Sequence, residues 1–179
     1  MQFFKTLAVA AAVISLSACS VCKTQEAPVK RTVADCINDQ KQELESGLGS
    51  EISAKQVKIS QIKGDALKVA VSSDYGFETA KSDISPNAEE LFTKIAKVVA
   101  KCDRTVIRVV GHTDSVGTPE RNQPLSERRA TAVGELIAKQ GVSKKRIKQE
   151  GRGEREPAAS NDTVEGKREN RRVEIIVSP

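Results

Sequence analysis

Aromatic side chains and histidine are scarce in this chain of 179 residues. It has no tryptophan, one tyrosine and four phenylalanines, and its single histidine is His112. Nucleic-acid-binding surfaces combine basic patches with aromatic side chains that stack on the bases. No basic run of this chain is interleaved with aromatics, so no nucleic acid partner is expected. The formal net charge of +5 is interpreted as an ordinary, well-charged surface.

Long apolar runs are also lacking, apart from one at the N-terminus. The stretch from about Leu7 to Leu16 is too short to cross a bilayer, which takes roughly 20 apolar residues. It follows Lys5 and ends in Leu16-Ser17-Ala18-Cys19, an arrangement that resembles a bacterial lipoprotein signal and its processing site. The alternative is an ordinary secretory signal whose small residues happen to precede a cysteine.

The lipoprotein resemblance implies that residues 1–18 are removed and that Cys19 carries acyl chains, which anchor a protein firmly. Residues 19–32 would then form a lipidated tether. Ser20 stands where an aspartate would retain many lipoproteins in the inner membrane. We therefore expect a protein anchored by lipid in the outer membrane, with its folded domain in the periplasm.

The four cysteines suit an oxidising compartment. With Cys19 lipidated, Cys22, Cys36 and Cys102 remain, and an odd number leaves one thiol free or paired between molecules. A Cys36–Cys102 disulfide would tie the N-terminal segment to the main domain, although Cys102 also ends an apolar helical stripe and could be a plain core residue. One histidine and no cysteine pair at ligand spacing argue against a metal site. No cofactor is expected either, because Gly151-x-Gly153 lacks the third glycine of a dinucleotide loop.

Hydrophobic periodicity predicts an α/β sandwich with helices packed on a mixed sheet. Ser85-Pro86 has the residue types of a helix N-cap and first position, and Ser126 is taken as the start of another helix. The expected helices cover 33–48, 85–102 and 126–141. The expected strands cover 57–62, 67–71, 105–110, 147–150 and 173–177, and residues 151–170 are expected to be mostly loop.

One edge of this sheet is the predicted binding site. The strands ending near Ser73 and Gly111 are joined by one crossover helix and should be parallel, so their C-terminal ends share an edge. Ligands of open α/β sheets bind at such an edge. Arg129, expected in the first turn of its helix, is disfavoured there by the helix dipole. It should therefore form a salt bridge with Asp114 or Glu127, or attract an anionic ligand.

Spaced motifs in the second half of the chain resemble the OmpA-like C-terminal domain family over about residues 66–178. The motifs are Phe77-x-x-x-Lys81-Ser82 with Pro86, Gly111-His112-Thr113-Asp114-x-x-Gly117, Asn122, Leu125-Ser126-x-x-Arg129-Ala130, Gly151-x-Gly153, Pro157, Asn161-x-Thr163, Gly166-x-Arg168 and Asn170-Arg171-Arg172-Val173-Glu174. The resemblance implies a mixed four-stranded sheet in βαβαββ order, with helices on one face, over residues 66–179. Residues 33–65 are expected to form an N-terminal helix and strand segment before it.

The resemblance also implies the ligand. The family binds peptidoglycan non-covalently through diaminopimelate of the stem peptide, whose free end carries an ammonium and a carboxylate. Asp114 matches the residue that accepts hydrogen bonds from the ammonium. Arg129 matches the residue that binds the carboxylate through two parallel hydrogen bonds. Thr113 and Asn122 match positions that bond the ligand or shape the pocket, and Phe77 begins its other wall. Glu78 and Ala80 depart from residues common in that wall.

The leading hypothesis is a binding protein that tethers the outer membrane to the cell wall. The alternative is a wall-anchoring accessory subunit of a secretion, efflux or motility complex, with residues 33–62 contacting other envelope proteins. A wall enzyme is the third possibility and is not expected, because no activated nucleophile is evident and only Asp114 is placed as a glycosidase carboxylate. His112 is interpreted as a structural hydrogen-bonding residue, and Arg171 and Arg172 as braces of the sheet edge.

Overall fold

The computed structural model describes residues 31–179. The predicted signal peptide, the expected lipidation of Cys19, Cys22 and most of the predicted tether lie outside the described residues. The described part is one compact unit. None of its helices combines the length and the apolar character needed to span a membrane.

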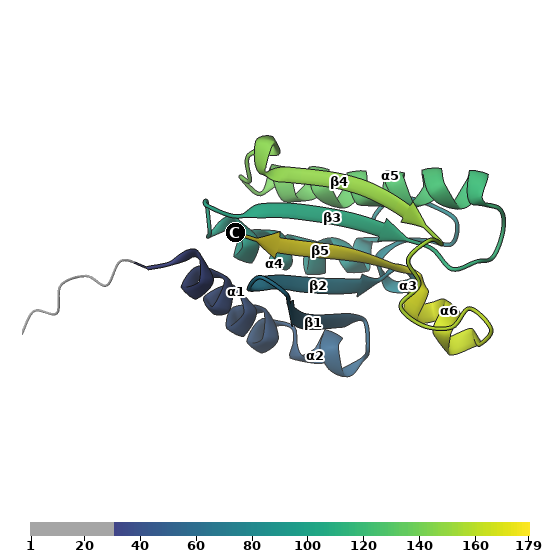
Figure 1. The fold of residues 1–179 in the computed structure, drawn as a ribbon, viewed down its shortest axis with the longest axis horizontal. Coiled ribbons are helices and arrows are strands. Elements are labelled where there is room, and N and C mark those ends of the chain that lie inside the picture. The colour runs from purple at the N-terminus through teal and green to yellow at the C-terminus, as the bar shows by residue number, and fades with distance from the viewer. Residues whose placement is uncertain (1–30) are drawn as a thin grey trace, which may run out of the picture. The chain divides into compact units, whose positions relative to one another are not determined.

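Five strands form a single mixed sheet in the order β1-β2-β5-β3-β4 (Figure 1). The strands are β1 (Val57–Ile62), β2 (Ala66–Ser72), β3 (Val106–His112), β4 (Ile147–Gly153) and β5 (Arg172–Ser178). All neighbouring strands are antiparallel except β3 and β4. Because β5 runs antiparallel to both β2 and β3, these two strands are parallel to each other, as predicted.

The α/β class is confirmed, and the four strands expected after residue 65 are present. The strand count of the whole sheet differs, because β1 of the N-terminal segment pairs with β2 and extends the same sheet to five strands. The β1–β2 turn contains Gly64 and Asp65, both with positive φ.

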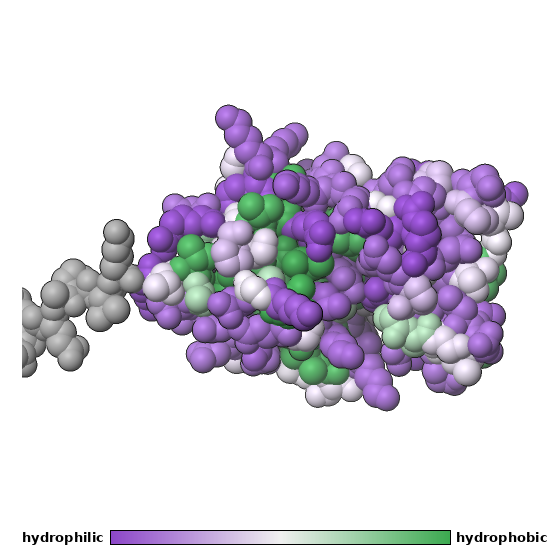
Figure 2. All heavy atoms as spheres, viewed as in Figure 1, coloured by the Kyte–Doolittle hydropathy of each residue, from purple (hydrophilic) through white to green (hydrophobic). Residues whose placement is uncertain are grey.

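The helices are α1 (Val33–Gly47), α2 (Gly49–Ser53), α3 (Ser73–Gly76), α4 (Pro86–Ala100), α5 (Pro119–Lys139), a 3₁₀ turn η1 (Lys144–Arg146) and α6 (Val164–Asn170). The long helices α4 and α5 lie on one face of the sheet, behind it in Figure 1, whereas α6 lies beyond the ends of the strands. Inward-facing strand residues and the apolar faces of α1, α4 and α5 form the main core. The opposite sheet face has a small apolar cluster of Ala66, Val110 and Ile176, and Figure 2 shows apolar patches on this face among hydrophilic residues.

Two helix starts follow from their sequences. The Thr32 side chain accepts a hydrogen bond from the Asp35 backbone, and the Asp35 carboxylate accepts one from Thr32 N, which completes a capping box at α1. Ser85 accepts from Ala88 N ahead of Pro86, so the predicted start of α4 is confirmed.

The predicted start of α5 is wrong. The helix begins at Pro119, seven residues before Ser126, and continues through Pro124. Arg129 therefore lies well inside the helix and not, as predicted, among the free N–H groups of its first turn. The short helices α2, α3 and α6 were also not predicted, and α6 lies in the segment expected to be loop.

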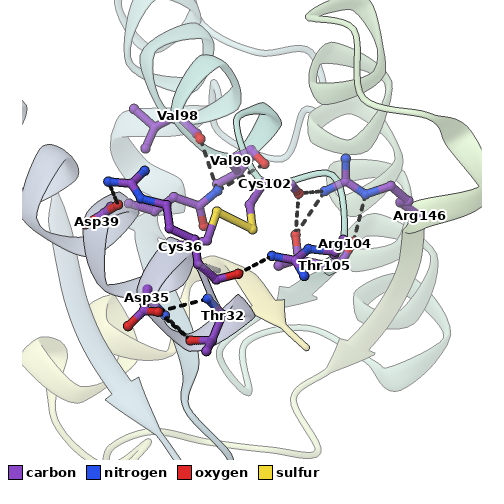
Figure 3. Close-up of a disulfide and its surroundings, with 12 residues drawn as sticks. Thr32, Asp35, Cys36, Asp39, Val98, Val99, Cys102, Arg104, Thr105 and Arg146 are labelled. Carbon is purple, nitrogen blue, oxygen red and sulfur yellow. Dashed lines mark hydrogen bonds and ion pairs between the residues drawn. A yellow bond between two sulfur atoms is a disulfide. The ribbon is translucent and has the colours of Figure 1, made fainter. Parts of the chain in front are cut away.

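The N-terminal helix α1 is fixed to the C-terminal end of α4. Cys36 and Cys102 form a disulfide with their Cα atoms 6.1 Å apart (Figure 3). Buried Gln40 donates to the carbonyl oxygens of Val98 (3.1 Å) and Val99 (3.3 Å) in the last turn of α4, where Val98 O also accepts from the backbone N–H of Lys101. The segment before residue 66 is thus part of the same fold as the sheet.

Candidate functional site

The candidate site lies where β2 and β3 end and β5 begins. Three connections meet at this edge: α3 with residues 77–84 after β2, residues 113–118 after β3, and Arg171 immediately before β5. Hydrogen bonds tie them together, because Arg171 reaches both Asp74 of α3 and Asp114 of the β3–α5 loop. The predicted convergence holds for the connections after β2 and β3. The third predicted element, a helix start at Ser126, is absent because α5 begins at Pro119, and Arg171 is the third element instead.

Asp114 is nearly buried, at 7% exposed. One carboxylate oxygen accepts from Val116 N at 3.1 Å, and the other accepts from Arg171 Nη1 at 2.7 Å. A carboxylate oxygen has two lone pairs, so each oxygen can accept one more hydrogen bond. The group is held in place and still has acceptor capacity for a cationic ligand.

Arg171 divides its donors between two carboxylates. Its Nε and Nη2 donate to the two oxygens of Asp74, both at 2.7 Å, and Nη1 donates to Asp114. The Arg171 hydrogen bonds lower the pKa of Asp74, and the two carboxylates raise the pKa of Arg171. The expected role of bracing the sheet edge is thus incomplete, because Arg171 also contacts the predicted ammonium-binding carboxylate.

Arg129 extends from α5 toward the loop after β2 and is only 5% exposed. Its Nε donates to the carbonyl oxygen of Lys81 at 3.0 Å, and its guanidinium lies over the Phe77 ring, 5.0 Å from the centroid. Within residues 31–179 it has no carboxylate within 4.0 Å. Neither salt bridge considered from the sequence, with Asp114 or with Glu127, is formed.

The electrostatics of Arg129 follow from its burial. Desolvation lowers the pKa of this guanidinium, whereas the negative charges of Asp74 and Asp114 oppose that shift. An arginine remains protonated in proteins, so the site holds a charged group with little water and no paired anion among the described residues. Such a charge is unfavourable unless a partner of opposite sign arrives.

Asn122 organises the loop between β3 and α5. Its side-chain nitrogen contacts the carbonyl oxygens of Asp114 (3.3 Å) and Val116 (3.2 Å) and the carboxylate of Glu154 (2.6 Å). Thr113 donates its backbone N–H to Gly153 O, and its buried hydroxyl has no partner in the described part of the chain. Asn122 thus shapes the loop, whereas the Thr113 hydroxyl is available for a further hydrogen bond.

Glycines let α5 approach the ends of β3 and β4. A Cβ at Gly111 would lie 2.1 Å from Ser126 O, and one at Gly151 would lie 2.4 Å from Ser126 Oγ. Ser126 Oγ also accepts from Gly153 N at 2.9 Å. Gly151-x-Gly153 therefore serves the close packing of α5 on the sheet, which sets the position of Arg129.

Comparisons with known proteins agree with this geometry. The model of the OmpA family matches residues 76–171. The chain belongs to the OmpA family. This OmpA-family chain is 36% identical to the outer-membrane lipoprotein YfiB of Pseudomonas aeruginosa over 131 residues, which covers 70% of this chain and 78% of YfiB.

Two further relatives of this OmpA-family chain have different lengths. The probable lipoprotein YiaD of Escherichia coli is 37% identical over 116 residues, or 65% of this chain and 53% of YiaD, so the chain spans about half the length of that relative. The solved structure of the cell wall anchor of the T6SS from Pseudomonas aeruginosa is similar with a TM-score of 0.66 and 31% identity. It covers 75% of this chain and 96% of the anchor.

One residue of the candidate site and one local network were not predicted from the sequence. Asp74 follows the end of β2, and its position beside a predicted strand end was the only available signal. Asn170, fully buried, accepts from the backbone of Ala158 and Ala159 and donates to Asn161, whose side chain accepts from Ser115 N. This network joins the loop before α6 to the loop that carries Asp114.

His112 lies outside the site. It is 2% exposed, and neither ring nitrogen has a hydrogen-bond partner within residues 31–179, so its expected role as a hydrogen-bonding residue is wrong. Burial lowers its pKa to about 4, with the positive charge of Arg172 adding to the shift, although Glu174 lies 3.9 Å away. Among the described residues, no three His, Cys, Asp or Glu side chains are grouped to hold a metal ion.

Proposed function

We propose that this OmpA-family protein binds peptidoglycan non-covalently through diaminopimelate and holds the cell wall to the outer membrane. Arg129 carries the proposal, because it is a buried guanidinium that lacks an anionic partner among the described residues. A planar guanidinium with its Nη groups unused can bind a carboxylate through two parallel hydrogen bonds.

The remaining groups suit the other charge of the same ligand. The ammonium of diaminopimelate would donate to the free acceptor positions of Asp114, and the carboxylate would lie on Arg129. The Phe77 ring supports Arg129 from the side of the β2–α4 connection. A zwitterionic end group therefore satisfies both buried charges at once, which a singly charged ligand does not.

The position of the tether supports an anchoring role. Arg31 O accepts from Arg104, just before β3 starts, whereas Asp114 follows the end of β3. The two ends of this seven-residue strand are roughly 20 Å apart, and they lie at opposite ends of the sheet in Figure 1. A lipid at Cys19, an outer-membrane location and a periplasmic domain belong to the proposal, since two attachment points raise overall binding.

We infer a binding role rather than a catalytic one. Asp114 is engaged by Arg171 and by its own loop, and His112 is buried and held neutral by that burial. Hydrolysis of a glycosidic bond needs a second carboxylate across a cleft. Both oxygens of the neighbouring Asp74 instead accept hydrogen bonds from the guanidinium of Arg171.

An accessory role in a larger envelope complex is the second candidate, favoured by the similarity to the T6SS cell wall anchor. Such a role would be favoured by an exposed apolar face on the first helix, where a partner could bind. Ile37, Leu44 and Leu48 are each 1% exposed and pack in the core, so α1 offers no such face. A partner would have to bind elsewhere.

Sedimentation of residues 20–179 with purified peptidoglycan tests the proposal. The unmodified protein should pellet with the wall, whereas Arg129→Ala should remain in solution, because its loss leaves the ligand carboxylate unpaired at a cost of roughly 2–5 kcal/mol. Arg128→Ala is the matched control, since Arg128 is adjacent, exposed and of the same charge. Pelleting of Arg129→Ala at the unmodified level would contradict the assignment of the pocket.

A further inference from the structure

Asp74 belongs to the charge cluster of the site but has no assigned role there. It lies in α3, and both its oxygens accept from the fork of Arg171 at 2.7 Å. The third nitrogen of the same guanidinium, Nη1, donates to Asp114 at 2.7 Å. Arg171 is thus shared unequally, with two hydrogen bonds to Asp74 and one to Asp114.

This division determines how much of Asp114 is left for a ligand. With Asp74 in place, Arg171 gives Asp114 a single N–H and Val116 N gives it one more. Without the Asp74 carboxylate, two donors of Arg171 lose their acceptor. The nearest remaining carboxylate is that of Asp114, and bidentate pairing is the arrangement an arginine fork prefers. The fork would then occupy the lone pairs that an ammonium needs.

Asp74 also balances the charge of the site. Asp74 and Asp114 are the anions, and Arg129 and Arg171 are the cations. These four side chains sum to zero, which suits a zwitterionic ligand, and the nearby positive charge of Arg168 also acts on Asp74. Among the charges that keep Arg129 protonated, Asp74 acts more strongly than Asp114. Loss of the Asp74 charge would leave the site positive, which opposes an ammonium and favours a carboxylate.

We propose that Asp74 is a positioning residue, which holds the fork of Arg171 off Asp114 and so keeps the ammonium site open. Asp74 need not touch the ligand for this role. The inference rests on the proposed function, because it concerns the same pocket and the ammonium of the same ligand.

Two synthetic peptides separate this role from a merely structural one. The first is the tripeptide L-Ala–γ-D-Glu–meso-diaminopimelate, and the second has 2-aminopimelate in the third position, which keeps the distal carboxylate but lacks the ammonium. Binding of each to the full-length protein in detergent is measured by calorimetry for the unmodified chain and for Asp74→Asn, which has nearly the same shape without the charge. Thermal melting establishes that each variant is folded.

We expect Asp74→Asn to bind the diaminopimelate peptide at least tenfold more weakly and the aminopimelate peptide equally well or more tightly. Asp74→Glu should restore much of the preference for the ammonium. Asp83→Asn is the control, because Asp83 is exposed in the same β2–α4 connection and makes no ion pair within residues 31–179. It should leave both affinities unchanged.

Other outcomes are distinguishable. Equal weakening of both peptides in Asp74→Asn would assign Asp74 a structural role and overturn the inference, as would unchanged affinity for both. If the unmodified chain binds neither peptide, the proposed function itself fails. Should Asp74→Asn not fold, Asp74→Ser tests the same claim with a smaller neutral side chain.

Discussion

The guanidinium of Arg129 lies over the ring of Phe77, with its central carbon 5.0 Å from the ring centroid. Phe77 is itself 4% exposed and packs at a tilt against Phe92 of the core, 6.2 Å between ring centroids. The positively charged group of the site therefore rests on an aromatic surface that is continuous with the core. Such a contact stabilises a cation by about 0.5–2 kcal/mol, depending on how well water is excluded.

Replacing Phe77 by leucine should weaken binding to the diaminopimelate tripeptide several-fold. Leucine retains apolar volume but lacks the ring face that attracts the guanidinium, so Arg129 becomes less well fixed. Phe92→Leu is the matched control, because the same change in the core should lower the free energy of unfolding without removing a contact to Arg129. Calorimetric titration of both variants, at a temperature where both are folded, distinguishes the two effects. Equal affinities in the two variants would contradict a role for the Phe77 ring.

The connection between β2 and α4, which forms one side of the site, contains a residue with strained backbone. Ala80 has φ of 58°, a left-handed conformation that costs a residue with a Cβ about 1 kcal/mol. Ala80→Gly should raise the free energy of unfolding by up to that amount and leave peptide binding intact, because the Lys81 carbonyl keeps its place. Ala54→Gly, at an exposed position with φ of −76°, should instead lower the free energy of unfolding. Urea unfolding of the two variants measures the difference in sign.

The sequence predicted the parts of this fold that depend on local patterns. Alternation in β2 and β5 and the Ser85-Pro86 start of α4 are local signals, and all are present in the structure. The start of α5 was misjudged because Ser126 and Thr118 are both acceptable N-cap residues, and Pro124 argues against a continuous helix. The three contacts of the Asn122 amide with the preceding loop and Glu154 accompany the earlier start, and no local pattern indicates them.

In the candidate site, too, residues in local motifs were predictable from the sequence and contacts between distant residues were not. Asp114, Arg129 and Phe77 stand in spaced motifs and could be named from a family resemblance. The Arg171–Asp74 fork joins residues 97 positions apart, and no periodicity links them. The attachment of β1 to β2 made the sheet wider than the resemblance implied, because the family motifs begin only after β1.

The Cys36–Cys102 disulfide should stabilise the domain without affecting the site. It closes a loop of 66 residues, for which chain entropy gives about 4 kcal/mol at 25 °C. The double variant Cys36→Ser/Cys102→Ser should unfold at lower urea concentration, and the unmodified protein under reducing conditions should behave like it. Binding of the diaminopimelate tripeptide should persist below the unfolding transition, because the site lies at the other end of the sheet. Loss of binding in the folded double variant would contradict this separation.

His112 should make the domain less stable in mild acid. Burial and the positive charges of Arg172, Lys68 and Arg152 lower the pKa of His112 to about 4 in the folded state, and Glu174 opposes the shift. In the unfolded chain the pKa of this imidazole is about 6.5. Between these values the unfolded chain binds more protons than the folded chain, so the free energy of unfolding decreases as the pH falls from about 6.5 toward 4. The slope is at most about 1.4 kcal/mol per pH unit and vanishes below the folded pKa.

His112→Leu tests the origin of this acid sensitivity. Leucine cannot titrate and removes two buried nitrogens that lack partners in the described structure. Urea unfolding at pH 7.5, 6.0 and 5.0 should therefore give a much flatter dependence in the variant. Glu174 keeps its own pKa below the ordinary value, through its hydrogen bond with Arg172 and in spite of burial, so its contribution is lost only at pH below about 4.5. The same slope in both proteins between pH 7.5 and 5.0 would show that His112 is not the group responsible.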